Sequence, residues 1–171
     1  MRPDRLHHNA YVSKDLERTR AFYEDIVGLP LVTTWREGEG DDAYCHVFFE
    51  LADGGALAFF QFSNPKTAEA LLSAKPSSHF YHIALNATLE CQQAVASKAQ
   101  AEGLEAQFID HGYCTSLYLI DPDGMVVELT VDTESAQPLV EERRKDPHRE
   151  LAEWLAGDHT TNNEIRHSDV R

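Results

Sequence analysis

The chain has 171 residues, 42% of them hydrophobic, and a formal net charge of −14. This length and composition allow one globular domain with an ordinary core, followed by a short tail. The negative charge repels phosphate backbones and anionic lipid, and no apolar run approaches the roughly 20 residues of a membrane helix, so we expect neither nucleic-acid nor membrane partners. Because residues 1–5 also lack the apolar segment of a signal peptide, we expect a soluble cytoplasmic protein.

The first third of the chain predicts a strand that begins at His8 and a helix that ends at Gly28. Asp15 is a suitable N-cap, and Gly28 stands where helices commonly end in the left-handed conformation. The face of the helix expected to pack inward carries Leu16, Thr19, Phe22, Tyr23 and Ile26. Three strands are expected next, at 31–35, 44–51 and 56–62, with Asp53-Gly54 as the last hairpin turn. Residues 38–42 are expected to form a mobile acidic loop, and residues 63–78 a link.

The same order of elements is repeated in the second half. A strand begins at His82, and a helix follows with Thr88 as its cap and Gly103 at its end. The residues expected to face inward on this helix are Ala94, Val95 and Ala99. Three further strands are expected at about 106–109, 115–120 and 125–131. The sequence therefore predicts two tandem βαβββ modules, about 6–62 and 79–131, within a domain of residues 1–132.

Residues 133–171 differ from the repeat. An amphipathic helix is expected across roughly 138–156, broken near Pro147, and a poorly ordered end after it. The cysteines Cys45, Cys91 and Cys114 are odd in number and form no CxxC pair, so we expect free thiols rather than disulfides or a structural zinc site.

The segment around one hairpin near the end of the domain carries three polar side chains typical of a chemical site, which are His111, Tyr118 and Glu128. Asp121-Pro-Asp-Gly124 has the residues of a tight turn, and the strands on either side carry Tyr118 and Glu128. We expect these two side chains to lie close together. Because Glu128 stands among Val and Leu, its carboxylate needs a cation or a hydrogen-bond donor.

The paired modules, with His8 opening the first strand, His82 opening the fifth and Glu128 in the last, resemble the vicinal oxygen chelate superfamily of glyoxalases, extradiol dioxygenases and bleomycin-type resistance proteins. The resemblance implies an α+β fold in which the modules form an open barrel around a metal held by His8, His82 and Glu128. Two imidazoles and a carboxylate suit Fe(II), and alternatively Mn, Zn or Ni. Gln61 is the only polar candidate for a fourth ligand in its strand. His7 is expected to point to the other face of its strand.

A second pattern resembles the type I extradiol dioxygenases. His111, Leu117-Tyr118, Asp121-Pro-Asp-Gly124 and Glu128 match the signature of that family in order and spacing. The resemblance implies that Tyr118 hydrogen-bonds a substrate oxygen and that His111 contacts the substrate or a developing oxyanion. The further acid-base histidine of that family is missing from residues 64–78, which leaves His79 and His46 as candidates.

These features together predict a non-haem Fe(II)-dependent extradiol dioxygenase that cleaves a small aromatic diol with O2, with His111, Tyr118 and His79 as catalytic residues. A homodimer or higher homo-oligomer is expected. Two alternatives stay open: a glyoxalase-like metal-dependent isomerase or lyase, and a dimeric drug-binding or metabolite-binding protein. Core packing is the default role for most of the aromatic residues that could also form the wall of an apolar cavity, which are Phe48, Phe59, Phe60, Phe62 and Phe80.

Overall fold

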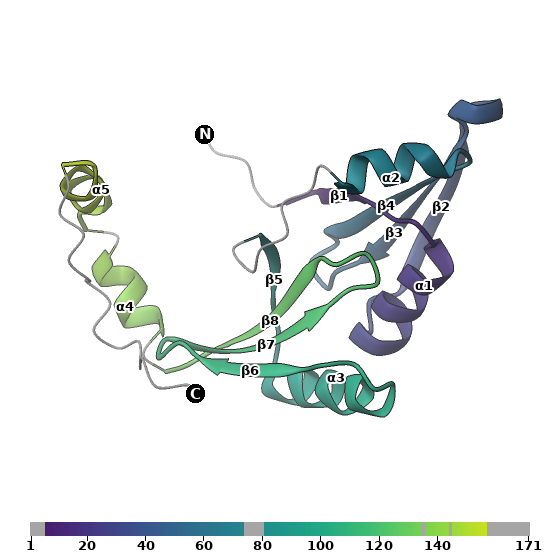
Figure 1. Cartoon of the computed structure of the whole chain (residues 1–171). Coiled ribbons are helices and arrows are strands. Elements are labelled where there is room, and N and C mark those ends of the chain that lie inside the picture. The colour runs from purple at the N-terminus through teal and green to yellow at the C-terminus, as the bar shows by residue number, and fades with distance from the viewer. Residues whose placement is uncertain (1–5, 74–80, 135, 144, 157–171) are drawn as a thin grey trace. The chain divides into compact units, whose positions relative to one another are not determined.

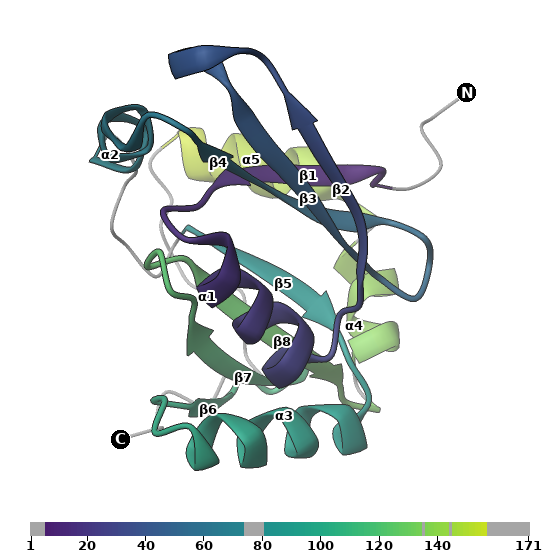
Figure 2. The same cartoon turned by 90° about the vertical axis from the view of Figure 1, so that its right-hand side faces the viewer.

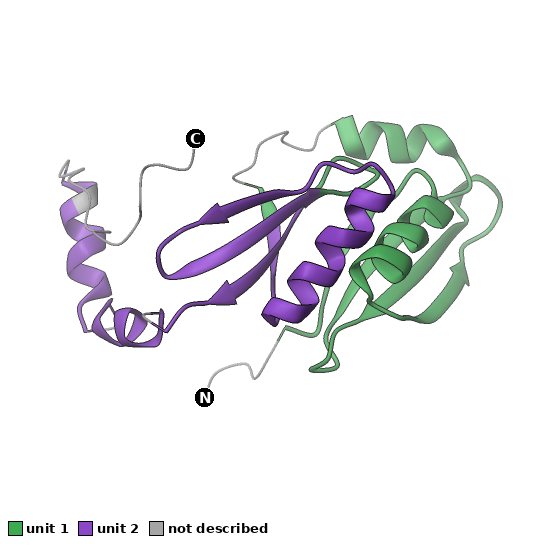
Figure 3. Ribbon diagram, turned by 90° about the horizontal axis from the view of Figure 1, so that it is seen from below, with its two compact units in different colours: residues 1–82, 120–126 green, residues 83–119, 127–171 purple. Residues whose placement is uncertain are grey.

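The computed structural model describes residues 6–73, 81–134, 136–143 and 145–156. Figure 1 labels its helices and strands in chain order. The chain divides into two compact units, which Figure 3 shows in different colours: residues 1–82 with 120–126, and residues 83–119 with 127–171. The turn between the last two strands is thus grouped with the first unit.

The first sheet has four strands in the order β1-β4-β3-β2. They are β1 (His8–Val12), β2 (Leu31–Glu37), β3 (Tyr44–Glu50) and β4 (Ala56–Phe62). β1 runs parallel to β4, while β3 is antiparallel to both of its neighbours, with a register shift in β2 between Leu31 and Thr33. All four predicted strands of the first module are confirmed.

The predicted helix of the first module is confirmed in position. It consists of α1 (Leu16–Arg20), which continues as a π-helix (Ala21–Val27) and ends at Gly28 with a φ of 89°. The Asp15 carboxylate accepts hydrogen bonds from the backbone N–H groups of Glu17 and Arg18, as its assignment as N-cap requires. The buried residues of this helical segment are Thr19, Phe22, Tyr23, Ile26 and Val27, whereas Leu16 is half-buried.

The two faces of the first sheet have different roles. One face carries Phe59 and Phe49, whose rings pack on Tyr23 with centroid distances of 4.7 and 5.6 Å. Phe59 is therefore a core residue, which is the default role expected from the sequence, and it does not line a cavity on the opposite face. Because side chains alternate along a strand, His8 and its cross-strand partner Ala56 lie on the opposite face. The same face carries the alternate residues of β4 and their partners in β3, which are Ala58, Phe60, Phe48 and His46. This second surface is called the His8 face below.

The second sheet repeats the order of the first, as β5-β8-β7-β6. Its strands are β5 (His82–Asn86), β6 (Gln107–Asp110), β7 (Cys114–Ile120) and β8 (Val126–Asp132). The tandem βαβββ modules and the α+β class predicted from the sequence are confirmed.

Helix α3 (Leu89–Ala101) covers the second sheet, as Figures 1 and 2 both show. Thr88 caps it by accepting from Cys91 N, and Val95 and Ala99 are buried as predicted. Ala94 is exposed, so that assignment was wrong. Gln92 is buried instead, and its amide donates to the carbonyl oxygens of Thr115 (3.1 Å) and Leu129 (2.8 Å). These bonds compensate the cost of burying a polar side chain.

The connection after β4 contains a helix that the sequence analysis missed, α2 (Pro65–Ser73). Asn64 accepts from Lys66 N at 3.1 Å, and proline is favoured in the first turn of a helix, so the local signal was present. Within the expected acidic loop, Gly40–Asp42 forms a short 3-10 helix. The remainder of the expected link, residues 74–78, lies outside the described residues.

The C-terminal part forms α4 (Ala136–Arg143) and α5 (Pro147–Leu155), so the break predicted near Pro147 is confirmed. The expected domain boundary after residue 132 stays a prediction, and the expected poorly ordered end after residue 156 lies outside the described residues. No helix among the described residues is long and apolar enough to cross a membrane.

Candidate functional site

A hydrogen-bonded chain of three side chains forms in the second unit. The Tyr118 hydroxyl donates to Glu128 Oε1 at 2.8 Å, and His111 Nε2 lies 3.0 Å from the same hydroxyl oxygen. Tyr118 comes from β7, Glu128 from β8, and His111 from the end of β6, where its backbone N–H bonds to Cys114 O. The predicted proximity of Tyr118 and Glu128 is confirmed, and His111 joins them.

The direction of these hydrogen bonds follows from the groups involved. The single phenol proton of Tyr118 is donated to the carboxylate, so His111 Nε2 must carry a proton and donate to the phenol oxygen. Burial raises the pKa of Tyr118, and the hydrogen bond to Glu128 and the charge of that carboxylate raise it further. The phenol therefore stays protonated at neutral pH.

The carboxylate end of this chain is buried, whereas His111 and Tyr118 are half-buried. Glu128 is only 5% exposed between Val127 and Leu129, and Ser116 is fully buried on β7. Burial also raises the pKa of the Cys114 thiol, which lies 3.7 Å from the Ser116 oxygen. Cys114 is thus a protonated, buried strand residue, as expected, rather than a reactive thiolate.

The first unit supplies His8 at the start of β1. Its ring meets the edge of Phe48 at a centroid distance of 5.6 Å. The His7 ring, expected on the other face of the strand, instead contacts His8, with 2.8 Å between their Nδ1 atoms. His7 precedes the first paired residue of β1, so the strict alternation of a strand does not apply to it.

His46 lies on the His8 face among aromatic rings. It stacks on Phe60 at 3.8 Å with an interplanar angle of 18°, and it lies 4.2 Å from Phe48. Its Nε2 atom is buried and has no hydrogen-bond partner among the described residues. Burial lowers the pKa of His46; the Glu37 charge opposes this effect, and His8 adds to it.

The predicted metal ligands come from different parts of the chain. His8 and His82 belong to the first unit and Glu128 to the second. Among the described residues, no group of three or more His, Cys, Asp or Glu side chains is gathered closely enough to hold a metal ion. Two imidazoles and a buried carboxylate nevertheless suit a divalent metal by their chemistry, so the ligand set stays a prediction.

Other predicted residues have different outcomes. His79 and Phe80 lie outside the described residues, and Gln61 does not lie on the His8 face. The register pairs Gln61 with Cys45, on the face that carries α1, and Gln61 Oε1 accepts from Leu16 N at 2.8 Å. Gln61, the only polar candidate in its strand for a ligand beyond the three predicted ones, uses this oxygen at the start of the helix, and the set of three ligands stays a prediction.

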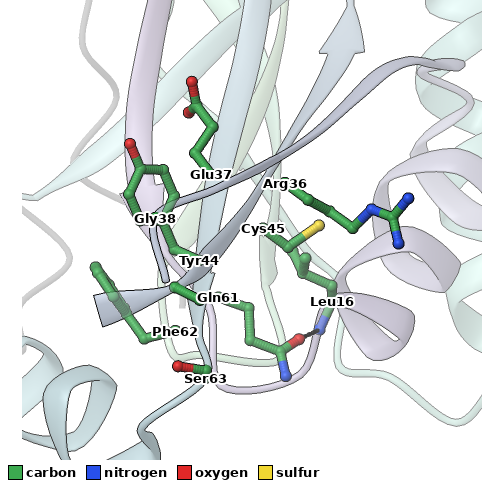
Figure 4. A pocket seen from close by; sticks show the side chains of 10 residues that line it. Leu16, Arg36, Glu37, Gly38, Tyr44, Cys45, Gln61, Phe62 and Ser63 are labelled. Atoms are coloured by element: carbon green, nitrogen blue, oxygen red, sulfur yellow. Dashed lines mark hydrogen bonds between the residues drawn. The ribbon is translucent and has the colours of Figure 1, made fainter. Parts of the chain in front are cut away.

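Figure 4 shows this bond inside a pocket of about 450 Å³ at the Phe62 end of the first sheet. His8 pairs with Ala56 at the opposite end of β4. The pocket therefore lies away from His8. Its lining residues come from α1 and from the ends of β2, β3 and β4.

Comparisons with solved structures show proteins of similar fold. A mutant of the fosfomycin resistance protein FosX from Listeria monocytogenes, complexed with Mn(II) and 1S,2S-dihydroxypropylphosphonic acid, is 22% identical with a TM-score of 0.60, over 81% of this chain and 99% of that one. Lactoylglutathione lyase from Agrobacterium tumefaciens is 20% identical with a TM-score of 0.52, over 75% and 94% of the two chains. A glyoxalase/dioxygenase from Nostoc punctiforme is 20% identical with a TM-score of 0.56, over 76% and 92%.

No curated protein sequence matches the chain significantly. Residues 5–129, however, match the family model of the Glyoxalase/Bleomycin resistance protein/Dioxygenase superfamily. This match covers both βαβββ modules, including His8, His82 and Glu128. The chain belongs to the Glyoxalase/Bleomycin resistance protein/Dioxygenase superfamily.

Proposed function

We propose that the protein is a non-haem Fe(II)-dependent extradiol dioxygenase that cleaves the ring of a catechol-type aromatic. The observation that carries the proposal is the chain from His111 through Tyr118 to Glu128, with distances of 3.0 and 2.8 Å. In the extradiol signature, His111 and Tyr118 correspond to residues that contact the substrate, and Glu128 corresponds to a metal ligand. The hydrogen bonds connect all three side chains. Superfamily membership alone does not select this reaction.

In this proposal His8, His82 and Glu128 hold the metal. When bound, Fe(II) would supply the redox chemistry that lets an aromatic diol react with O2, while the same donors also accept Mn, Zn or Ni. The carboxylate of Glu128 is already buried and oriented by the Tyr118 hydroxyl, and hydrogen bonds of this kind orient metal ligands.

The other residues act on the substrate and its protons. Tyr118 keeps its phenol proton at neutral pH, and when substrate binds this proton would turn from Glu128 to a substrate oxygen, while His111 holds the phenol oxygen in place through Nε2. His111 is then near enough to contact the substrate as well. The aromatic side chains of the His8 face, among them Phe48 and Phe60, exclude water and pack against the substrate ring.

The decisive experiment is purification without oxygen, loading with Fe(II), and addition of a panel of catechols and air. We expect a yellow ring-opened product and consumption of one O2 per diol. A chelator should abolish the reaction, and Fe(II) should restore it. Bound iron without any product across the panel would refute the extradiol reaction while leaving the fold intact.

Two variants test the role of the hydrogen-bonded chain. Tyr118→Phe keeps the ring and removes the hydroxyl, so we expect kcat to fall about 100-fold or more while iron content is retained. Tyr81→Phe is the matched control, because Tyr81 is 59% exposed. An unchanged kcat in Tyr118→Phe would contradict the proposed role.

The principal competing function is a metal-dependent isomerase or lyase, which the fold similarity to lactoylglutathione lyase supports. Turnover without O2 consumption, with Mn, Zn or Ni as the active metal, would favour it. Ligand binding that needs no metal and survives His8→Ala would favour a binding protein instead. The homo-oligomer expected from the sequence stays a prediction, and light scattering after gel filtration would measure it.

A further inference from the structure

The His8 face contains one polar ring in an otherwise apolar aromatic group. His46 in β3 is stacked on Phe60 and lies beside Phe48, and Phe48 in turn meets the His8 ring. The register of β1, β4 and β3 places all four residues on the same side of the sheet. His46 therefore belongs to the surface from which the proposed metal ligand His8 projects.

The packing of His46 does not explain why the residue is a histidine. A phenylalanine would stack on the neighbouring rings equally well and would bury no polar nitrogen. His46 Nε2, in contrast, is buried and unpaired among the described residues. An unpaired buried polar atom is costly and is uncommon in native proteins, so it points to a partner that arrives with a ligand.

We infer that His46 is a specificity-determining residue whose Nε2 forms a hydrogen bond with a polar substituent of an aromatic ligand bound on the His8 face. The inference rests on the proposed function and deepens it by describing the substrate: a flat ring that packs among Phe48 and Phe60 and carries a hydroxyl group directed at His46. Burial lowers the pKa of His46, so at neutral pH the ring offers one donor and one acceptor nitrogen to such a group.

The edge strand of the sheet lies next to His46. Trp35 of β2 is the direct cross-strand partner of His46, and β2 is the outer strand of the sheet. Trp35 is 57% exposed, so its side chain can change rotamer at little packing cost.

The test compares His46→Phe with the wild-type protein in two measurements. In the metal-free protein we expect an unchanged or higher melting temperature, because the substitution keeps the stack and removes the unpaired nitrogen. In the Fe(II)-loaded protein, titrated with catechol by calorimetry without oxygen, we expect about tenfold weaker binding, the value of one neutral hydrogen bond. In air, KM should rise about tenfold and kcat should change less than about threefold.

Two further variants separate hydrogen bonding from packing. His46→Gln retains a donor and an acceptor and should restore part of the catechol affinity. Phe60→Leu disturbs the stack while His46 is retained, and it should lower the melting temperature. Unchanged catechol affinity in His46→Phe overturns the inference, whatever the melting temperature. A wild-type protein that binds catechol but does not cleave it overturns the proposed function instead, and the affinity comparison still decides the role of His46.

Discussion

Replacing Tyr23 by phenylalanine removes one hydroxyl from the core of the first unit and leaves the ring in place. Tyr23 is fully buried, and its hydroxyl donates to Asp121 Oδ2 at 3.1 Å. Asp121 is 4% exposed and also accepts from the backbone N–H groups of Asp123 (2.9 Å) and Met125 (2.7 Å). The hydroxyl therefore links the helix to the turn that follows β7.

The expected loss can be derived from this geometry. A hydrogen bond to a charged acceptor contributes roughly 1.5 to 3 kcal/mol, and no aromatic packing is lost in Tyr23→Phe. Asp121 keeps its two backbone donors in the variant, so we expect the free energy of unfolding to fall by about 2 kcal/mol, near the middle of this range. For a chain of this size that corresponds to a decrease of about 4 to 8 °C in melting temperature.

Because this hydroxyl can ionise, its contribution to the free energy of unfolding should depend on pH. Burial raises the pKa of Tyr23 well above 10.0, and the charge of Asp121 raises it further. Its contribution to stability is therefore complete below pH 10 and is lost as the pH rises above that value, because only the unfolded chain then releases the proton readily. The free-energy difference between wild type and Tyr23→Phe should narrow above pH 10.

Urea denaturation at pH 7 and at pH 10.5 measures both effects. The control is Tyr81→Phe, which should change the free energy of unfolding by less than about 0.5 kcal/mol because Tyr81 is exposed. A Tyr23→Phe variant as stable as the wild type at pH 7, or a difference that does not depend on pH, would refute the reasoning.

Other substitutions test local features of the fold by the same denaturation assay. Gln92→Leu removes an amide that bonds to two buried carbonyl groups and should cost about 2 kcal/mol; no loss would mean that these groups find other donors. Asp15→Ala removes the N-cap and should cost about 1 kcal/mol; an unchanged free energy of unfolding would mean that the N–H groups of Glu17 and Arg18 find other acceptors. Gly38→Ala adds a Cβ that would clash with the Asp42 carbonyl oxygen at a φ of 74°, whereas Gly28→Ala meets no atom within 4 Å, so Gly38→Ala should be the more destabilising of the two.

The sequence was sufficient for features that depend on local patterns. The repeat, the two helix caps at Asp15 and Thr88, and the hairpin that joins Tyr118 to Glu128 all follow from residue spacing and turn chemistry. The caps and the hairpin are each determined by residues within about a dozen positions of one another, and the repeat shows itself when two such local patterns recur along the chain.

The features that were missed depend on register and on neighbours distant in the sequence. The face to which Gln61 or Phe59 points is decided by the pairing of β4 with β1 and β3, which spacing alone does not reveal. The burial of Gln92 in place of Ala94 depends on two carbonyl groups in other strands. The unpaired nitrogen of His46 likewise becomes visible only when the aromatic rings around it are placed.

The grouping of residues 120–126 with the first unit means that the first module depends on part of the second. The hydroxyl of Tyr23, in the first module, finds its acceptor in a turn encoded by the second. Without that turn the Tyr23 hydroxyl would lose its carboxylate acceptor and become open to water. The first module therefore gains stability from a segment that follows Tyr23 by 98 positions in the chain, and a fragment that ends before residue 120 should unfold more readily than the same module within the whole protein.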